Sequence, residues 1–252
     1  MGKMLKTETI LFDLSDEVTD YFQILSAQRF LNNLRNSGSI PDVIMTLQHR
    51  NVYTTGIHDN PSEYTGLSGL PVKVERGGSI TYHGPGQLVV YFIISLKDRG
   101  INILDLIRAV QDSVVAYLAI FGVAAEGRLG KETGIWIQSR KICSIGFAVR
   151  EFATLHGIAL NISTDLRAFE VIKPCGFPSA VMTSLLSETG KNVDVKDAAR
   201  GLYDELVCRL PIKTAEIHRG IESLERYVSE QLSETAHAKI GADSSMTRSP
   251  FR

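Results

Sequence analysis

The sequence predicts a single α/β domain of the α+β type, in which helices pack on a mixed β-sheet. The chain of 252 residues is 44% hydrophobic and 22% charged, which is enough apolar material to bury one full core. Its apolar residues follow two periods, because short runs typical of strands alternate with segments at helical spacing. The sequence shows no internal repeat and no second-domain linker, so we expect residues 1–233 to form one domain.

The first predicted elements are a strand, a helix and a second strand. Ile10 to Leu14 is a short apolar run, and Ser15-Asp16-Glu17 provides the cap of a helix that reaches Asn36. Val43 to Leu47 is typical of a buried strand. It leads into the polar segment from Gln48 to Gly56, which is a candidate second binding loop.

A long helix is the strongest prediction farther along the chain. Apolar residues recur at helical spacing from Ile103 to Phe121, between a cap at Asn102 and a stop at Gly122. The other expected elements are a surface connection at 60–71, strands at 72–75 and 88–94, a hairpin of strands at 134–137 and 141–149, a strand at 154–162, a loop at 168–178, and helices at 194–210 and 217–232. Ser, Thr, Ala and charged residues dominate the end of the chain, so residues 234–252 are expected to be a disordered tail.

Composition excludes several classes of protein. The 27 basic and 28 acidic residues give a formal net charge of -1, so the sequence lacks the broad positive field that nucleic acid or an anionic membrane surface requires. The N-terminus has no apolar signal core, and no run approaches the roughly 20 apolar residues of a membrane span. The three cysteines form no Cys-x-x-Cys pair, which argues against disulfides and structural zinc. We therefore expect a cytoplasmic protein that binds neither nucleic acid nor membranes.

The stretch from Arg76 to Gln87 is the strongest candidate binding site. Its four glycines and one proline let the backbone approach a ligand closely. Arg76, Thr81, His83 and Gln87 supply a charge and several hydrogen-bonding groups. A glycine-rich hairpin or bulge beside a core strand is the structural alternative. The density of polar residues favours a binding role.

Cysteine and lysine side chains are the candidates for chemistry. Period-two alternation places Lys141 and Cys143 on one face of a strand, where Lys141 would by itself reach solvent along its aliphatic stem. The apolar neighbours of Cys143 favour burial, and Cys208 lies in a predicted helix, where a free cysteine is commonly a small buried hydrophobe. Pro174-Cys175-Gly176 is different, because it places a thiol in a rigid, open loop, either as a nucleophile or as an incidental loop cysteine.

Six separated motifs resemble, in order and in spacing, those of the lipoyl(octanoyl) transferase family. They are Arg76 to Gln87, Gly134-Ile135-Trp136, Lys141 to Gly146, His156 to Asn161, Asp165-Leu166 and Pro174-Cys175-Gly176. The resemblance covers roughly Ile10 to Leu210, and six ordered motifs are far more specific than one glycine-rich loop. Arg50-Asn51 departs from the pattern, because the family often has proline there.

The resemblance implies an acyl transfer. In this family an octanoyl group leaves acyl carrier protein, rests on a cysteine as a thioester and passes to a lysine of a lipoyl domain, in 2-oxo acid dehydrogenases or the glycine cleavage H protein. Cys175 matches the family's nucleophile, and Lys141 matches the lysine that lowers the thiol's pKa and handles its proton. The donor is already activated, so no cofactor and no metal are expected. The implied fold is similar to the catalytic domain of biotin and lipoate ligases.

The resemblance also assigns acyl-substrate binding to three stretches. They are Arg76, Gly77, Gly78, Ser79, Ile80, Thr81, Tyr82 and His83, then Ser144, Ile145 and Gly146, then Gly157, Ile158 and Ala159. From the residues alone, His83 is either a substrate contact or a hydrogen-bonded core histidine, and a structural role is favoured for His156. Backbone N–H groups near Gly176 or Gly77-Gly78 are candidates for stabilising the oxyanion of each half-reaction.

Two other functions fit parts of the pattern. An ATP-dependent lipoate-protein or biotin-protein ligase shares a glycine-rich stretch and a strand lysine, but it needs no nucleophilic cysteine, so Pro174-Cys175-Gly176 argues against it. A non-catalytic protein that binds acyl groups or lipoyl domains would need neither Lys141 nor Cys175. The sequence therefore favours the transferase.

Overall fold

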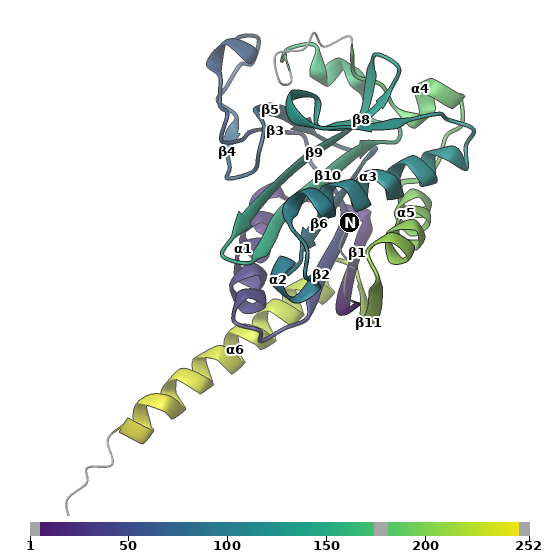
Figure 1. Ribbon diagram of the computed structural model, residues 1–252. Coiled ribbons are helices and arrows are strands. Elements are labelled where there is room, and N and C mark those ends of the chain that lie inside the picture. The colour runs from purple at the N-terminus through teal and green to yellow at the C-terminus, as the bar shows by residue number, and fades with distance from the viewer. Residues whose placement is uncertain (1–5, 174–180, 247–252) are drawn as a thin grey trace, which may run out of the picture.

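The computed structural model describes residues 6–173 and 181–246, with side chains as far as His237. Within these ranges an eight-stranded mixed sheet has the strand order β11-β1-β2-β6-β10-β9-β8-β7 (Figure 1). The strand β1 (Thr7–Thr19) pairs in parallel with β11 (Ile212–Arg219) and β2 (Asp42–His49), and the ladders from β2 to β7 are antiparallel. The remaining strands of this sheet are β6 (Gln87–Ile93), β10 (Ala153–Asn161), β9 (Arg140–Arg150), β8 (Gly134–Ile137) and β7 (Glu126–Arg128).

Helices cover both faces of the sheet. The helices α3 (Ile103–Ala119) and α5 (Val195–Arg209) lie over one face, and α1 (Tyr21–Asn36) and α6 (Ile221–Met246) lie over the other (Figure 1). Alternate residues of β6 enter opposite cores, Leu88, Val90 and Phe92 on the α3 side and Val89, Tyr91 and Ile93 on the α1 side. Because side chains of a strand alternate between its faces, a strand covered on both sides is apolar throughout. The prediction of a buried strand at this run is confirmed.

A second sheet of three short strands lies beside the first. In it β3 (Val52–Thr55) pairs in parallel with β4 (Val72–Lys73) and antiparallel with β5 (Ile80–His83). An apolar cluster connects this sheet to the segment after β10, and its members are Tyr64, Ile80, Tyr82, Phe169, Ile172 and Met182. The shorter elements are the helices α2 (Leu96–Arg99) and α4 (Leu185–Thr189) and the 3-10 turns η1 (Pro61–Glu63), η2 (Gly130–Glu132) and η3 (Leu166–Phe169).

The helix caps agree with the sequence at α3 and α5 but not at α1. Asn102 and Asp105 form a reciprocal capping box at α3, and Asp194 accepts from the backbone N of Lys196 at α5. The helix α1 starts at Tyr21 and is capped by Asp20, so the expected cap at residues 15–17 is wrong. Residues 15–19 belong to β1, whose ladder with β2 continues past a bulge to Thr19. Pairing with a neighbouring strand overrides the local capping signal there.

The C-terminal part also differs from the prediction. Residues 212–219 form the strand β11, although the sequence pattern predicts a helix from Ile217. The ladder with β1 explains the difference, because pairing with a strand far away in the sequence decides the conformation of residues 212–219 at the edge of the sheet. The helix α6 begins after Gly220 and continues to Met246, so residues 234–246 are helical where composition predicts a disordered tail. Figure 1 shows the end of α6 projecting from the body.

A buried ionic cluster holds the start of β2. The Asp42 carboxylate accepts hydrogen bonds from Arg35 Nε and Arg99 Nε, each at 2.7 Å, and all three side chains are buried. Thr7 Oγ1 donates to the same carboxylate at 2.8 Å, and the backbone N of Ser95 donates at 3.0 Å. Charges are tolerated in an interior when such partners replace water.

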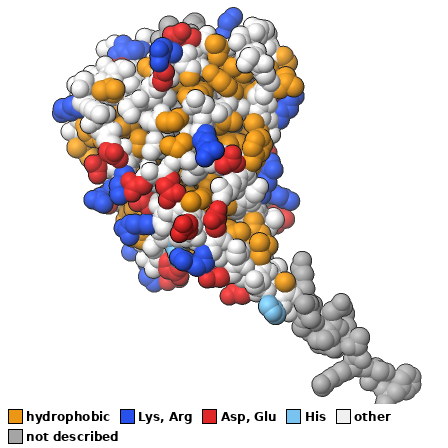
Figure 2. All heavy atoms as spheres, turned by 180° about the vertical axis from the view of Figure 1, so that it is seen from behind, with side chains coloured by type: hydrophobic (Ala, Val, Ile, Leu, Met, Phe, Trp, Pro, Cys, Tyr) orange, Lys and Arg blue, Asp and Glu red, His pale blue; other side chains and the backbone are white. Residues whose placement is uncertain are grey.

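The surface carries charges of both signs. Figure 2 shows acidic and basic side chains interspersed on the face opposite to that of Figure 1. Among the described helices, none is both long enough and apolar enough to cross a membrane.

Candidate active site

A cavity of about 720 Å³ lies where the glycine-rich stretch meets β9 and β10. Its volume falls within the range of roughly 300–1,000 Å³ that is usual for small-molecule sites. The wall is built from residues 76–81 and 83, from residues 144–147 of β9 and from residues 156–159 of β10. The fold thus brings together the three stretches for which the sequence motifs predict substrate binding.

Tyr82 is the exception among these candidates. Its neighbours Thr81 and His83 line the cavity, but Tyr82 lies on the other face of β5, as alternation in a strand requires. There its hydroxyl donates to Asn51 Oδ1 at 2.8 Å, and its ring packs edge-on against Phe169. The structure therefore gives Tyr82 a packing position outside the cavity wall.

Close approach between Gly146 and the glycine-rich stretch narrows the cavity. A Cβ atom at Gly146 would lie 3.1 Å from the carbonyl oxygen of Gly77 and 3.3 Å from Arg76 Cδ. The buried Arg76 holds this stretch, because its NH2 donates to Thr54 O at 2.7 Å and to Thr54 Oγ1 at 2.9 Å. A side chain at position 146 would push the two walls apart.

Lys141 is buried and lines the cavity. Only 5% of the surface of Lys141 is exposed to solvent. The alternative interpretation, in which this side chain reaches solvent along its aliphatic stem, is therefore wrong. Gly134 leaves room for this side chain, because a Cβ atom there would lie 2.5 Å from Lys141 Cε and 2.5 Å from the carbonyl oxygen of Cys143. Lys141 Nζ lies 5.6 Å from the centre of the Trp136 ring, within the range of a cation–π contact. The glycine and tryptophan of the 134–136 motif thus both contribute to the lysine's surroundings.

A β-bulge separates Lys141 from Cys143. Lys141 pairs with Trp136 and Cys143 pairs with Ile135, which leaves Ile142 as an extra residue. Ile142 and Cys143 both enter the core, so the predicted single face shared by Lys141 and Cys143 is wrong. Burial raises the pKa of Cys143 to about 12, although Lys141 acts in the opposite direction. The expected burial of this thiol is confirmed, and it is not ionised near neutral pH.

The other two cysteines have different positions. Cys208 lies in α5 as predicted, but it is exposed and not part of the core. Cys175 lies in the segment 174–180, outside the described residues. Described residues on both sides of this segment contact the cavity wall. The backbone N of Lys173 donates to the carbonyl of Glu63 at 2.7 Å, and the backbone N of Thr183 donates to the carbonyl of Lys141 at 3.0 Å.

A hydrogen-bonded chain links His83 to the backbone beside Lys141. His83 Nδ1 lies 2.8 Å from Gln87 Oε1, Gln87 Nε2 donates to Asn161 Oδ1 at 2.9 Å, and Asn161 Nδ2 donates to the carbonyl of Thr183 at 2.9 Å. Burial lowers the pKa of His83 to about 4. His83 is therefore a neutral, hydrogen-bonded histidine that also lines the cavity, and its role as a substrate contact stays a prediction.

His156 has an unusual backbone conformation. Its φ of 62° lies in the left-handed region within strand β10, and its backbone N donates to Gln28 Oε1 at 2.9 Å. Its Nε2 lies 3.7 Å from Glu75 Oε2. Contact with His156 and the salt bridge from Arg29 hold the pKa of Glu75 well below its usual range, while burial lowers the pKa of His156 itself. Strained backbone clusters at functional sites, and His156 lines the cavity, but the structural role favoured for His156 stays a prediction.

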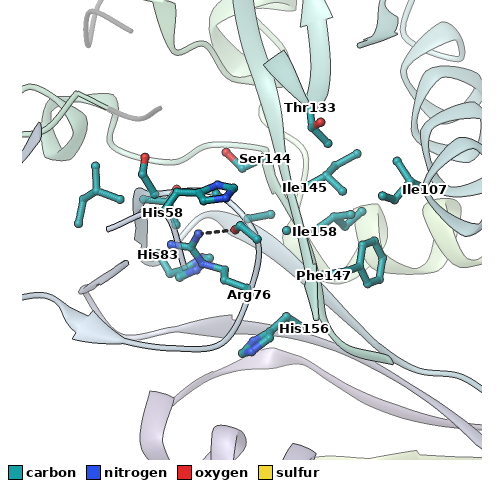
Figure 3. Close-up of a pocket in the computed structure, with 18 of the residues that line it drawn as sticks. His58, Arg76, His83, Ile107, Thr133, Ser144, Ile145, Phe147, His156 and Ile158 are labelled. Atoms are coloured by element: carbon teal, nitrogen blue, oxygen red, sulfur yellow. Dashed lines mark hydrogen bonds between the residues drawn. The ribbon is translucent and has the colours of Figure 1, made fainter. Parts of the chain in front are cut away.

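Several wall residues lie outside every predicted stretch. They include Tyr21, His58, Asn60, Glu63, Tyr91, Ile103, Ile107, Lys131 and Thr133. Figure 3 shows Ile107 with Ile145, Phe147 and Ile158 on one side of the cavity, and Arg76, His58 and His83 on the other. These residues come from α1, the 57–63 connection, β6, the first two turns of α3 and the η2 turn. No local sequence pattern indicated that these residues line a cavity, because only the fold brings their separate segments together.

The fold is shared with solved structures of lipoate-protein ligases. A bi-partite lipoate protein ligase from Thermoplasma acidophilum matches with a TM-score of 0.64 at 20% sequence identity, over 90% of this chain and 91% of that one. A crystal structure of lipoate-protein ligase A bound with ATP matches with a TM-score of 0.65 at 20% identity, over 90% of this chain and 94% of that one. At such identities the likeness shows the fold alone.

The sequence comparisons go further. The family model for the lipoyl protein ligase A/B catalytic domain matches residues 20–207. A probable octanoyltransferase 2 of Picrophilus torridus is 41% identical over 211 residues, which are 84% of each chain. An octanoyltransferase of Bacteroides fragilis is 37% identical over 188 residues, which are 70% of this chain and 85% of that one. The chain therefore belongs to the lipoyl protein ligase A/B catalytic-domain family, on its octanoyltransferase side, and is an acyltransferase.

Proposed function

We propose that this chain transfers an octanoyl group from octanoyl-acyl carrier protein, through a thioester on Cys175, to the lysine of a lipoyl domain. The observation that carries the proposal is the buried Lys141 in the wall of a cavity. On either side of the segment that contains Cys175, Lys173 and Thr183 donate backbone hydrogen bonds to wall residues, Glu63 and Lys141 respectively. The octanoyltransferase relatives support the choice of acyl group.

The apolar side of the cavity suits an alkyl chain. Ile107, Ile145, Phe147 and Ile158 gather there (Figure 3). Each methylene group removed from water contributes about 0.8 kcal/mol to binding. The acyl chain therefore supplies much of the binding energy, and the polar groups of the wall remain available for the carbonyl.

Lys141 activates the thiol in this proposal. An unperturbed cysteine has a pKa of about 8.5, so only about a few per cent of it is thiolate at neutral pH. A cation held nearby in a shielded pocket favours the thiolate, and about 2 kcal/mol of such stabilisation makes roughly half of the thiols reactive at neutral pH. The thiolate attacks the donor carbonyl, the new C–S bond forms, the carrier's C–S bond breaks, and the carrier thiolate takes the proton from Lys141.

The second half-reaction returns the proton. The acceptor amine attacks the thioester carbonyl, the C–N bond of the amide forms, and the bond to Cys175 breaks. Lys141 takes the proton that the amine loses and passes it to the Cys175 thiolate. The acceptors are lipoyl domains of 2-oxo acid dehydrogenases and the glycine cleavage H protein. Because the donor is a thioester, neither ATP nor a metal enters the cycle.

Intact-mass measurement tests the proposal. On incubation with octanoyl carrier protein, the wild-type chain should gain the mass of one octanoyl group, and hydroxylamine should remove it because thioesters are labile to that reagent. Cys175→Ala should show no adduct. Cys143→Ala is the matched control and should keep the adduct. An adduct that persists on Cys175→Ala would exclude the assigned nucleophile.

Donor choice separates the transferase from a ligase of the same fold. The wild-type chain should acylate a lipoyl domain from octanoyl carrier protein in the absence of ATP. Product formed from free octanoate only when ATP is present would instead assign the chain to the ligases.

A further inference from the structure

The charges that line the cavity are unequal in number. Arg76, Lys131 and Lys141 contribute positive charge, and Glu63 is the one carboxylate among the described residues of the wall. A lysine amine has a pKa near 10.4, so it arrives as a cation at neutral pH. In the acyl-enzyme, where Lys141 has already given up its proton, Arg76 and Lys131 still repel such a group, and a carboxylate offsets that repulsion. Glu63 is therefore the wall residue whose charge matches the incoming amine.

The carboxylate of Glu63 has room for a ligand donor. Its Oε2 is buried and accepts no hydrogen bond from the residues that the structure describes. Its Oε1 lies 3.5 Å from Asn60 Nδ2, which is a long and weak contact. The residue as a whole is only partly buried, so Glu63 is accessible both from the cavity and from solvent. A buried carboxylate oxygen without a donor is costly, and an ammonium group would relieve that cost.

The backbone around Glu63 is fixed by its neighbours. Asn60 caps η1 by accepting from the backbone N of Ser62, and the carbonyl of Glu63 accepts from Lys173. Tyr64 OH donates to Asp59 Oδ1 at 2.9 Å, which anchors the other side of the turn. Asp59 also accepts from Thr55 and pairs with Lys73, so this carboxylate is saturated. Of the two acids in the connection, only Glu63 lines the cavity.

We propose that Glu63 binds the ammonium group of the acceptor lysine and positions it for attack on the acyl-enzyme. This inference rests on the proposed function and adds a specific site for the second substrate. Glu63 forms a charge-assisted hydrogen bond with the ammonium as it enters. The ammonium gives one proton to solvent, and the neutral amine then attacks the thioester. The C–N bond forms, the C–S bond breaks, and Lys141 carries the second proton from the amine nitrogen to the Cys175 thiolate. Glu63 does not contact the acyl carbonyl, and it is a positioning residue.

Separate measurement of the two half-reactions tests this role. In Glu63→Gln, acylation of the enzyme by octanoyl carrier protein should proceed at the wild-type rate, as followed by intact mass. Transfer from the isolated acyl-enzyme to a lipoyl domain should have a kcat/KM lower by roughly ten- to a hundredfold, the usual value of a hydrogen bond to a charged group. Most of the loss should appear in KM, and Glu63→Asp should recover part of it.

A neutral nucleophile provides the control reaction. Hydroxylamine carries no charge at neutral pH, so its rate of reaction with the acyl-enzyme should be the same in Glu63→Gln and wild type. Glu170 is an exposed glutamate four residues before the segment 174–180, and Glu170→Gln should leave both half-reactions unchanged. Equal slowing of the lysine and hydroxylamine reactions, or slower acylation in Glu63→Gln, would overturn the proposal. Failure of the wild type to form an acyl-enzyme would instead reject the proposed function.

Discussion

Two buried polar regions of this molecule differ in how completely their hydrogen bonds are satisfied. Around Asp42, two arginines, a threonine and a backbone N–H saturate the carboxylate. In the cavity, the buried atoms Glu63 Oε2 and Thr81 Oγ1 accept or donate no hydrogen bond among the described residues. Interiors normally satisfy their polar groups. The saturated cluster is a structural feature, whereas the unsatisfied groups of the cavity remain available to a ligand.

The largest expected effect comes from removing the cavity's buried cation. Lys141→Met keeps a long side chain but removes the charge and the proton-transfer group, so acyl transfer should fall by about a thousandfold. The free energy of unfolding should stay equal or rise, because burial of a charge is costly. Steady-state transfer and denaturant unfolding measure the two effects. Activity within roughly tenfold of wild type would mean that the lysine takes no part in proton transfer.

Removing the Asp42 carboxylate from the centre of the saturated cluster should have the opposite effect, because stability should fall while acyl transfer is kept. Asp42→Ala leaves Arg35 and Arg99 as buried charges without their carboxylate, and the free energy of unfolding should fall by about 3–5 kcal/mol. Folded protein should keep its transfer rate, because the cluster is not part of the cavity wall. Denaturant titration and an activity assay at low temperature measure this. Glu8→Gln, which breaks an exposed pair with Lys213, is the control and should change nothing measurable.

The buried histidines should make stability depend on pH. Burial lowers the pKa of His83 from 6.5 to about 4. Between these values the unfolded chain binds a proton that the folded protein does not, so the free energy of unfolding falls as the pH drops, by up to about 3 kcal/mol. Burial lowers the pKa of His49 and His156 in the same direction.

Denaturant unfolding across this pH window gives the measurement. His83→Gln should lose stability less steeply than wild type as the pH falls, and the two slopes should coincide above neutral pH. Parallel curves throughout the acidic range would show that His83 does not contribute.

Local patterns predicted those parts of the fold that depend on residues close in sequence. The helix from Ile103 follows from its apolar spacing and from the Asn102 cap, which both act within one or two turns. The start of α1 and the strand β11 could not be predicted in this way, because β1 pairs with distant segments on both sides. Pairing between strands that are distant in the sequence leaves no mark in the local residue pattern. A prediction from that pattern therefore follows the capping residues and the helical spacing instead.

The candidate site shows the same division. The motifs indicated the three stretches that meet at the cavity, since each carries glycine and polar residues in a fixed order. They did not reveal that Tyr82 lies outside the wall or that a bulge at Ile142 separates Lys141 from Cys143. Both depend on strand register, because a shift of one residue moves each side chain to the opposite face of the sheet.

The sequence by itself determined the family, the order of the main secondary-structure elements before β11, and the candidates Lys141 and Cys175. Only the tertiary structure decided that Lys141 is buried, that Cys143 belongs to the core, and that Glu63 joins the wall from a separate connection. The physical reason is that residue type and spacing fix local conformation and possible chemistry. Burial and charge environment are set instead by contacts between segments far apart in the chain.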